Sequence, residues 1–271
     1  MTNIVIGAGS GMGAAAARQL ADRGPLVLAD MNLAAAESLA AELGGEATAV
    51  ACDVSDQDQL DSLFAGVDDL EALVHTAGLS NSMASGRRIL DVNLIGVERV
   101  IRTAETRLRA GSVGVFLASQ SGYMLPDDPG LLAALDDPLS DGFLDRLDKY
   151  FEVDEPTLAY QASKRGVHRL VRHHAKAWGT KGARIVSLSP GITDTPMGRG
   201  EENAHPEMLR MIEASPSGRR GTPEEVAQVI AFLTSPAASL ITGSDVLVDG
   251  GMATILPRGT WNGKLRSTTA P

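Results

Sequence analysis

A tyrosine and a lysine four residues apart, Tyr160 and Lys164, form the pair in this chain whose types and spacing best suit chemistry. Their segment, residues 159–179, has the composition of a helix, and this spacing puts both side chains on one helix face. A phenol titrates near pH ~10, so stabilising its ionised form near neutrality requires roughly 3–4 kcal/mol. A neighbouring ammonium supplies stabilisation of that sign. The pair could therefore act as an acid and base; the alternative is a solvated polar helix face.

A cluster of glycines directly follows the first apolar run of the chain, residues 3–7. The spacing G-x-x-x-G-x-G fits Gly7, Gly11 and Gly13, whereas G-x-G-x-x-G would require glycine where Met12 stands. Glycines at such a turn let backbone N–H groups approach an anion at a helix N-terminus, where the helix dipole also favours negative charge. After the first strand of an alternating chain, this cluster predicts a site for the phosphates of a dinucleotide.

Carboxylates and small residues follow the next three apolar runs. Asp30 ends residues 25–30, where a carboxylate accepts hydrogen bonds from the hydroxyls of an adenosine ribose and repels a 2′-phosphate. Because no arginine stands at 31 or 32, we expect NAD rather than NADP; a loop-end or capping aspartate is the alternative reading. Asp53 and Val54 stand at the end of the run 47–53, and Ala77 and Gly78 follow the run 70–75. These four residues could border the adenine and the rest of the cofactor.

Apolar runs typical of strands alternate with helical segments along almost the whole chain, which is the pattern of a parallel sheet covered on both faces. The expected strands are residues 3–7, 25–30, 47–53, 70–75, 112–119, 183–189 and 246–249. Ser55 and Thr222 are the predicted caps of two of the helices between them. The pattern predicts a doubly wound, seven-stranded Rossmann sheet in a single α/β domain, residues 1–271.

Two segments interrupt this alternation. Residues 124–158 are rich in Asp and Pro but carry Leu and Phe at helical spacing, which predicts two short amphipathic helices inserted before the Tyr160 helix. Residues 192–220 are mostly polar, with Gly, Pro and three Met, and form either a substrate flap or an ordinary surface excursion. The C-terminal tail, residues 252–271, has no usable period.

The composition excludes several classes of protein. With 271 residues, 44% of them hydrophobic, the chain is long enough for one large core, and no stretch approaches the ~20 apolar residues that span a bilayer. A net charge of −10 argues against a nucleic-acid surface, which needs clustered Lys and Arg. Cys52 is the only cysteine, so no internal disulfide is possible, and we expect no secretory leader. We expect a cytoplasmic protein that binds neither nucleic acid nor membrane.

Other groupings are weaker candidates for a site. Ser119, His168 and an aspartate could form a hydrolase triad, but the sequence around Ser119 lacks the G-x-S-x-G elbow. His168, His173 and His174 are offset around one helix, which favours a solvated face over a metal site. The aspartates of residues 136–148 resemble an acidic helix face and lack the spacing of a calcium-binding loop. We therefore expect no bound metal.

In their order along the chain, these motifs resemble the short-chain dehydrogenase/reductase family over nearly its whole length. The residues that carry the resemblance are Gly7-x-x-x-Gly11-x-Gly13, Asp30, Ala77-Gly78, Asn93 in DVNLIG, Ser119 in LASQSG, Tyr160-x-x-x-Lys164 and Pro190-Gly191-x-x-x-Thr195. Within the family, the segments LAYQASK, AWGTKGAR and PGITDTP are most similar to bacterial 3α-hydroxysteroid dehydrogenase/carbonyl reductase. There are two departures, Ile6 where many members have Thr and His75-Thr76 in place of Asn-Asn, and either could loosen the turn near the cofactor.

The resemblance implies a role for each of these residues. Tyr160 would be the general acid and base, and Lys164 would lower its pKa while binding the nicotinamide ribose. Ser119 would hydrogen-bond the substrate oxygen, and Asn93 would help hold a water in a proton relay. The remaining cofactor-binding residues that it implies are Gly7, Ser10, Gly11, Met12, Gly13, Asp30, Asp53, Val54, Ala77, Gly78, Pro190 and Gly191, with Ile192 and Thr195 at the nicotinamide carboxamide.

The expected function is that of an NAD-dependent oxidoreductase that interconverts a secondary alcohol and a ketone, a hydroxysteroid or similar hydrophobic carbonyl compound being one candidate. The alternatives are a reductase of 3-oxoacyl thioesters and a non-catalytic dinucleotide-sensing protein. Family members commonly pair through the tyrosine-bearing helix, which the insertion at 124–158 could obstruct. We therefore expect a homo-oligomer, a dimer formed through the last helix, 222–234, and the last strand, 245–249.

Overall fold

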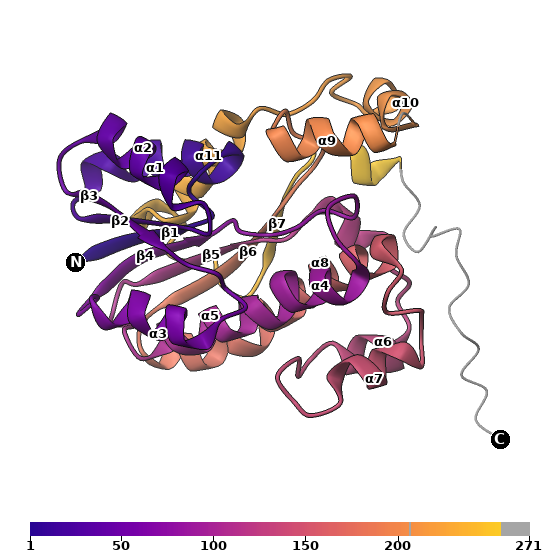
Figure 1. Cartoon of the computed structure of the whole chain (residues 1–271), viewed down its shortest axis with the longest axis horizontal. Coiled ribbons are helices and arrows are strands. Elements are labelled where there is room, and N and C mark those ends of the chain that lie inside the picture. Colours follow the sequence, from indigo (N-terminus) through magenta and orange to yellow (C-terminus); the bar gives the residue numbers. More distant parts are fainter. Residues whose placement is uncertain (206, 256–271) are drawn as a thin grey trace.

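A parallel sheet forms the centre of the protein, and the computed structural model shows its strands in the order β3-β2-β1-β4-β5-β6-β7 (Figure 1). The structure describes residues 1–205 and 207–255. The strands are β1 Thr2–Ile6, β2 Leu26–Asp30, β3 Ala47–Ala51, β4 Leu70–His75, β5 Val113–Leu117, β6 Arg184–Pro190 and β7 Asp245–Val248. The strand order reverses between β1 and β4, which places a crevice at the carboxyl ends of these strands. The predicted seven-stranded Rossmann sheet is confirmed.

Helices cover both faces of the sheet (Figure 1). One face carries α1 (Gly11–Leu20), α2 (Leu33–Leu43) and α11 (Pro223–Leu233), and the other carries α3 (Gln57–Ala65), α5 (Gly96–Glu105) and α8 (Pro156–Thr180). Each face has its own apolar core. Every residue of β5 is buried, as expected for a strand that is covered on both sides.

Capping side chains set where several helices begin. Thr222 accepts a hydrogen bond from the Glu225 N–H, and the Glu225 side chain accepts one from the Thr222 N–H, so the predicted cap is confirmed. The predicted cap at Ser55 is wrong, because Asp56 caps α3 by accepting from two backbone N–H groups. The Ser55 hydroxyl instead donates to Asp53, at 2.7 Å.

The segment between β5 and α8 contains two short helices, α6 (Pro129–Ala134) and α7 (Phe143–Asp148), as its apolar spacing predicts. Its buried apolar side chains belong to the core on the α8 face of the sheet: Leu131, Leu135, Phe143, Leu147 and Phe151. The Asp136 carboxylate accepts a hydrogen bond of 2.6 Å from Nη2 of Arg169 and a second from its Nε. The acidic segment is therefore tied directly to α8.

The segment 192–220 also forms two helices, α9 (Pro196–Ala204) and α10 (Glu207–Ala214), which lie beyond the end of the sheet (Figure 1). Arg220 forms an ion pair with Glu202 and ties the end of the segment back to α9. In the tail, Met252–Thr254 form a 3-10 helix, and residues 256–271 lie outside the described part of the chain. Within that part, no helix is both long and apolar enough to cross a membrane.

Candidate active site

A cavity of about 310 Å³ lies where the glycine cluster, the ends of the central strands, α8 and the start of α9 meet. Most residues predicted to bind the cofactor are on its wall: Gly7, Ser10, Gly11, Met12, Gly13, Asp30, Asp53, Val54, Ala77, Gly78, Tyr160, Lys164 and Thr195. The predicted site residues away from this wall are Asn93, Ser119, Pro190, Gly191 and Ile192. The cavity is also bordered by residues that sequence reasoning did not single out, among them Met83, Arg88 and Met197.

The glycine cluster leaves no room for side chains. A Cβ on Gly13 would lie 2.0 Å from the Gly7 carbonyl oxygen, and one on Gly7, whose φ is +86°, would lie 2.5 Å from the Ala77 nitrogen. The Thr76 hydroxyl lies 3.0 Å from the carbonyl oxygens of both Ile6 and Gly7. Thr76 departs from the family pattern, and this departure could have loosened the turn; its hydroxyl instead supports the turn. The turn leads into α1 at the cavity wall.

The Asp30 carboxylate holds the glycine cluster at the end of β2. Its Oδ2 accepts a hydrogen bond of 2.8 Å from the Gly9 N–H, and its Oδ1 accepts one of 2.8 Å from the Asn32 N–H. A carboxylate has about four lone-pair sites, so each oxygen can still accept a hydrogen bond from a ribose hydroxyl. The negative charge of Asp30 lies on the cavity wall, where it disfavours an anionic group placed next to it.

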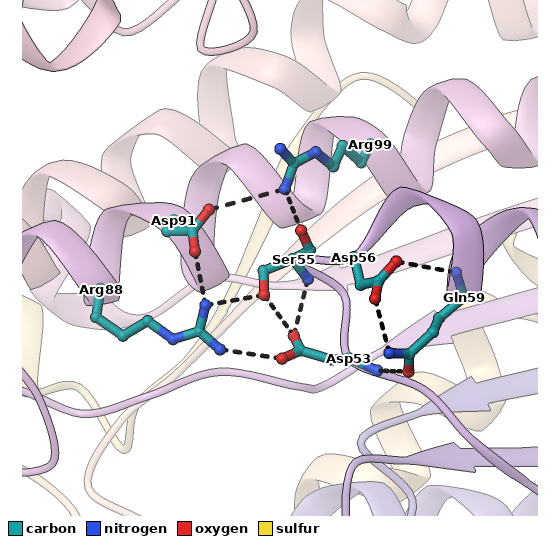
Figure 2. A network of polar contacts seen from close by, with 7 residues as sticks. All are labelled: Asp53, Ser55, Asp56, Gln59, Arg88, Asp91 and Arg99. Carbon is teal, nitrogen blue, oxygen red and sulfur yellow. Dashed lines mark hydrogen bonds and ion pairs between the residues drawn. The ribbon is translucent and has the colours of Figure 1, made fainter.

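A polar network surrounds the end of β3 (Figure 2). The Asp53 carboxylate accepts hydrogen bonds from the Ser55 N–H at 2.9 Å, from the Ser55 hydroxyl at 2.7 Å and from Nη2 of Arg88 at 3.1 Å. Burial acts to raise the pKa of Asp53, but these hydrogen bonds outweigh it and lower the pKa. Arg88, on α4 (Gly86–Leu90), also donates to Asp91 at 2.6 Å. Asp53 thus borders the cavity with its carboxylate already engaged.

Asn93 lies in a π turn, Asp91–Ile95, that interrupts the helical segment between α4 and α5. Its side chain is fully buried, and its Oδ1 accepts from the Leu79 N–H while its Nδ2 donates to the Leu79 carbonyl, both at 2.8 Å. Gly78 fits closely beside it, because a Cβ there would lie 3.1 Å from Asn93 Oδ1. Asn93 therefore holds the loop after β4 in place, and both polar atoms of its amide are occupied.

Ser119, Tyr160 and Lys164 converge where β5 ends against α8. The Ser119 side chain lies where it can hydrogen-bond the Tyr160 hydroxyl, which acts to lower the Tyr160 pKa. The Lys164 ammonium donates to the Leu117 carbonyl at 3.2 Å and lies 5.7 Å from the centre of the Tyr160 ring. Ser119 Oγ also accepts from the Ser121 N–H at 3.1 Å, which orients the serine. The structure therefore brings together the hydroxyl, phenol and ammonium that were predicted to act on the substrate.

Burial dominates the electrostatics of this group. It raises the pKa of Tyr160 against the opposing effect of the Ser119 hydrogen bond, and the carboxylate of Glu201 raises it further. Burial also lowers the pKa of Lys164 from 10.5 to about 8. The expected lowering of the Tyr160 pKa by Lys164 is therefore not the net result in the protein chain alone, because withdrawing the phenol from water raises the pKa.

His75, at the end of β4, is fully buried. Its ring stacks on Phe116 with ring centres 5.9 Å apart, and outside its own backbone neither ring nitrogen has a hydrogen-bond partner among the described residues. Burial first, and the charge of Lys164 second, lower the pKa of His75 from 6.5 to about 3. The imidazole is therefore neutral in the folded protein even in mild acid.

We expect His75 to make the protein less stable in mild acid. In the unfolded chain His75 binds a proton below about pH 6.5, whereas in the folded protein it binds one only near pH 3. His75 therefore leaves the free energy of unfolding unchanged above pH 6.5 and lowers it as the pH falls below that value. Between about pH 7 and about pH 5, the wild type should lose about 2 kcal/mol more unfolding free energy than His75→Asn, measured by urea titration. His173→Asn, at a histidine with 43% of its side chain exposed, is the control. Equal pH dependence in wild type and His75→Asn would contradict the assignment.

The alternative motifs form no comparable site. His168 Nε2 lies 2.8 Å from Oγ of Ser189, which is not the serine of the suggested triad, and 3.4 Å from Asp245 Oδ1, so both partners meet the same ring nitrogen. A hydrolase triad instead needs its serine and its carboxylate on opposite nitrogens of the histidine. Within the described ranges, no group of three or more His, Cys, Asp or Glu is arranged to hold a metal ion.

The chain is similar to known dehydrogenases along most of its length. Residues 2–126 match the family described as short chain dehydrogenase, and residues 151–253 match the family described as enoyl-(acyl carrier protein) reductase. The chain is 32% identical over 269 residues to cis-4-hydroxycyclohexanecarboxylate dehydrogenase of Sinomonas cyclohexanicum, with 93% of this chain and 96% of that protein covered. It is 29% identical over 191 residues to 3-alpha-hydroxysteroid dehydrogenase/carbonyl reductase of Comamonas testosteroni, with 69% and 74% covered.

The fold is shared with solved structures as well. A 3-ketoacyl-(acyl-carrier-protein) reductase from Brucella melitensis, solved in complex with NADH, superposes with a TM-score of 0.71 at 25% identity. The superposition covers 93% of this chain and 98% of that one. The two matched sequence regions contain the two sides of the cavity, because the glycine cluster lies in the first and the Tyr160 helix in the second.

Proposed function

Because the chain belongs to the short-chain dehydrogenase/reductase family, we propose that it is an NAD-dependent alcohol dehydrogenase/ketone reductase that acts on a secondary alcohol. The observation that carries the proposal is that Tyr160 and Lys164 lie on the wall of the cavity that also includes the glycine cluster, with Ser119 acting on Tyr160 from beside it. A dinucleotide and an alcohol can meet there, whereas a solvated helix face would leave the phenol and the ammonium in water. A hydroxysteroid or similar hydrophobic alcohol suits the apolar side chains of Met83 and Met197 on the same wall.

The cavity suits a nicotinamide dinucleotide in two respects. Ser10, Gly11 and Met12 place the N-terminus of α1 on the cavity wall, where backbone N–H groups and the helix dipole favour a pyrophosphate. Asp30 offers a carboxylate to ribose hydroxyls and disfavours a 2′-phosphate, which supports NAD over NADP. We assign the adenine to the side of Asp53, next to Val54. We also propose that the protein acts in the cytoplasm, where nicotinamide dinucleotides are available.

Proton transfer falls to the side chains that converge beside the cavity. When bound, the nicotinamide supplies the hydride chemistry, taking a hydride from the carbinol carbon or returning one to a ketone. During oxidation, Ser119 hydrogen-bonds the substrate oxygen, and the Tyr160 oxygen takes the hydroxyl proton as the carbonyl forms. Lys164 keeps positive charge near the phenol and holds the nicotinamide ribose. Because burial raises the Tyr160 pKa, alcohol oxidation should rise with pH as the phenol ionises.

Asn93 would support this proton transfer through its backbone. Both polar atoms of its amide are bonded to Leu79, so a water of a proton relay would be held by its main-chain carbonyl. A π turn is a place where such a carbonyl can depart from the regular helical pattern, and these turns are frequent at functional sites.

The chain after β6 would complete the nicotinamide side of the site. Gly191 follows Pro190 in a tight passage, because a Cβ on Gly191 would lie 2.7 Å from the Asp249 Cα. Thr195 accepts a hydrogen bond of 2.9 Å from the Gly198 N–H and so starts α9 at the cavity wall. We assign Ile192 and Thr195 to the nicotinamide carboxamide.

A substrate panel tests this function. The purified protein is given a cyclic secondary alcohol or a hydroxysteroid with NAD or NADP, and a 3-oxoacyl thioester with the reduced cofactors, while the nicotinamide absorbance is followed. We expect turnover of a secondary alcohol with NAD and much less with NADP. Turnover of the thioester alone would replace this proposal by the thioester-reductase alternative. Cofactor binding without any turnover would indicate a dinucleotide-sensing protein.

We also propose that the protein is a homodimer, because the insertion lies over the helices through which family members commonly pair. Asp136 is bonded to Arg169 on α8. Leu139, a few residues later, borders the same shallow hollow as Arg99 and Arg102 of α5. The insertion is therefore bonded to α8 and reaches the hollow beside α5, where we expect it to obstruct a partner.

The other pairing surface, α11 with β7 and the turn between them, carries exposed apolar side chains. Phe232, Leu240 and Leu247 are 45%, 96% and 37% exposed. Light scattering should therefore give the mass of a dimer, and Phe232→Asp combined with Leu240→Asp should give that of a monomer. Leu139→Asp, on the insertion, should leave the dimer intact. A tetramer in the wild type would contradict the proposal.

A further inference from the structure

A carboxylate joins two segments that border the cavity. Glu201, on α9, accepts hydrogen bonds from the Ser82 N–H at 3.0 Å and from the Ser82 hydroxyl. With its amide oriented so that the nitrogen faces this carboxylate, Asn81 donates to Glu201 Oε1 at 3.0 Å. Asn81 and Ser82 belong to the loop after β4, which also carries Met83. The helix α9 is thus fastened to the loop on the β4 side of the cavity.

The face of α9 that carries Glu201 also carries a residue of the cavity wall. Met197 lies four residues before Glu201 and shares its side of the helix. Met197 and Met83 are both on the cavity wall, and they are 37% and 55% exposed. The Glu201 carboxylate also acts on Tyr160, whose pKa it raises. Its negative charge is therefore felt at the hydroxyl proposed to react.

Among the described residues, no positive side chain pairs directly with this carboxylate. Two arginines of the segment 192–220 are committed elsewhere, since Arg220 pairs with Glu202 and Arg199 pairs with Asp194 at 2.7 Å. The groups that donate hydrogen bonds to Glu201 are all uncharged: a hydroxyl, an amide and a backbone N–H. Within the part of the chain that the structure describes, no ion pair includes Glu201.

We propose that Glu201 determines substrate charge: its carboxylate disfavours anionic alcohols and ketones, and the site takes uncharged ones. The inference rests on the proposed function. Like unit charges roughly 8 Å apart at an effective dielectric constant near ~20 repel each other enough for a preference of roughly thirtyfold. The relative from Sinomonas cyclohexanicum is named for an anionic alcohol, and this chain should disfavour that compound.

The test compares two alcohols of the same ring and hydroxyl that differ in charge, 4-hydroxycyclohexanecarboxylate and 4-hydroxycyclohexanecarboxamide, oxidised with NAD. The ratio of their kcat/KM values is measured in the wild type and in two variants. We expect the wild type to prefer the amide, and Glu201→Gln to reduce this preference roughly thirtyfold. The glutamine oxygen can still accept from the Ser82 N–H, so the contact across the cavity is kept. Glu201→Lys should reverse the preference.

Glu213→Gln is the matched control, because it removes the same charge from an exposed position on α10. It should keep the wild-type ratio, and an equal change there would overturn the inference by showing that net charge alone is responsible. An unchanged ratio in both Glu201 variants would overturn it while the proposed function stands. If the wild type oxidised neither alcohol and nothing in the substrate panel, the proposed function would fall and this inference with it.

Discussion

Replacing Tyr160 with phenylalanine should lower kcat for alcohol oxidation by roughly 10²–10⁴-fold and leave the affinity for NAD nearly unchanged. The variant keeps the ring that packs against the core and loses only the hydroxyl that meets Ser119. Below about pH 8 the neighbouring Lys164 cannot replace it, because its amine is protonated there and accepts no proton. Steady-state kinetics gives kcat, and quenching of cofactor fluorescence gives the dissociation constant.

Tyr150→Phe is the matched control for this change. Tyr150 lies in the insertion, with its hydroxyl packed so closely against Gly130 that a Cβ there would be 2.6 Å from it. Tyr150 does not line the cavity, so this variant also loses a phenol oxygen, but one outside the site. It should retain wild-type kinetics. If Tyr160→Phe kept more than about a tenth of the wild-type kcat, the phenol would not be the acid and base. Loss of NAD affinity together with turnover would point instead to damage of the cofactor site.

Asp30→Asn should reduce the preference for NAD over NADP by roughly 10²–10³-fold. Two like unit charges ~4 Å apart at an effective dielectric constant of ~20 repel by about 4 kcal/mol, and the substitution removes one of them. The asparagine nitrogen cannot accept a hydrogen bond, so the contact with either the Gly9 or the Asn32 N–H is lost as well. We therefore expect weaker use of NAD alongside the gain with NADP, both measured as kcat/KM.

Asp53→Asn provides the comparison, since it also removes a carboxylate charge from the cavity wall. That carboxylate is engaged by Ser55 and Arg88, and it lies at the end of the neighbouring strand (Figure 2). The NAD to NADP ratio should therefore stay close to the wild-type value. A shift as large as that of Asp30→Asn would mean that overall charge, and not the position of Asp30, decides between the cofactors.

The sheet could be predicted because its inner strands are covered on both faces and so read as continuous apolar runs. β4 begins and ends at the predicted residues, and β5 is two residues shorter at its C-terminal end than the run 112–119. Local signals also sufficed where partners are close in sequence, as in the capping of α11 by Thr222 and Glu225. The glycine cluster and Asp30 belong to this group, because their spacing alone places them at the ends of neighbouring strands.

What could not be predicted depends on contacts between distant parts of the chain. Ser55 has the side chain of a helix cap, yet Asp53 and Arg88 engage it and Asp56 takes the role. The only signal for Arg88 was a pair of arginines at the start of a short helix, which says nothing about Asp53. The contact of Glu201 with Ser82 joins residues 119 positions apart. Such pairings follow from the folded path of the backbone, which no local pattern records.

The Tyr160 pKa illustrates the same limit in energetic terms. Sequence spacing shows that an ammonium stands near the phenol, and from this alone a lowered pKa is expected. How far the phenol is withdrawn from water is a property of the assembled core, and here burial is the larger effect. Under the proposed function, the favourable charge would come from Lys164 together with the positive nicotinamide ring of the cofactor.

The most direct measurement follows the hydrogen itself. A secondary alcohol that the protein oxidises is labelled with deuterium at the carbinol carbon, and the reduced cofactor is analysed by mass spectrometry and NMR, with Tyr160→Phe in parallel. Hydride transfer beside the Tyr160 phenol requires the label at C4 of the nicotinamide in the wild type and almost no labelled cofactor in the variant. Label released to water, or equal transfer with and without the phenol, would contradict the assignment of this cavity as the place where a hydride and a proton leave the same alcohol.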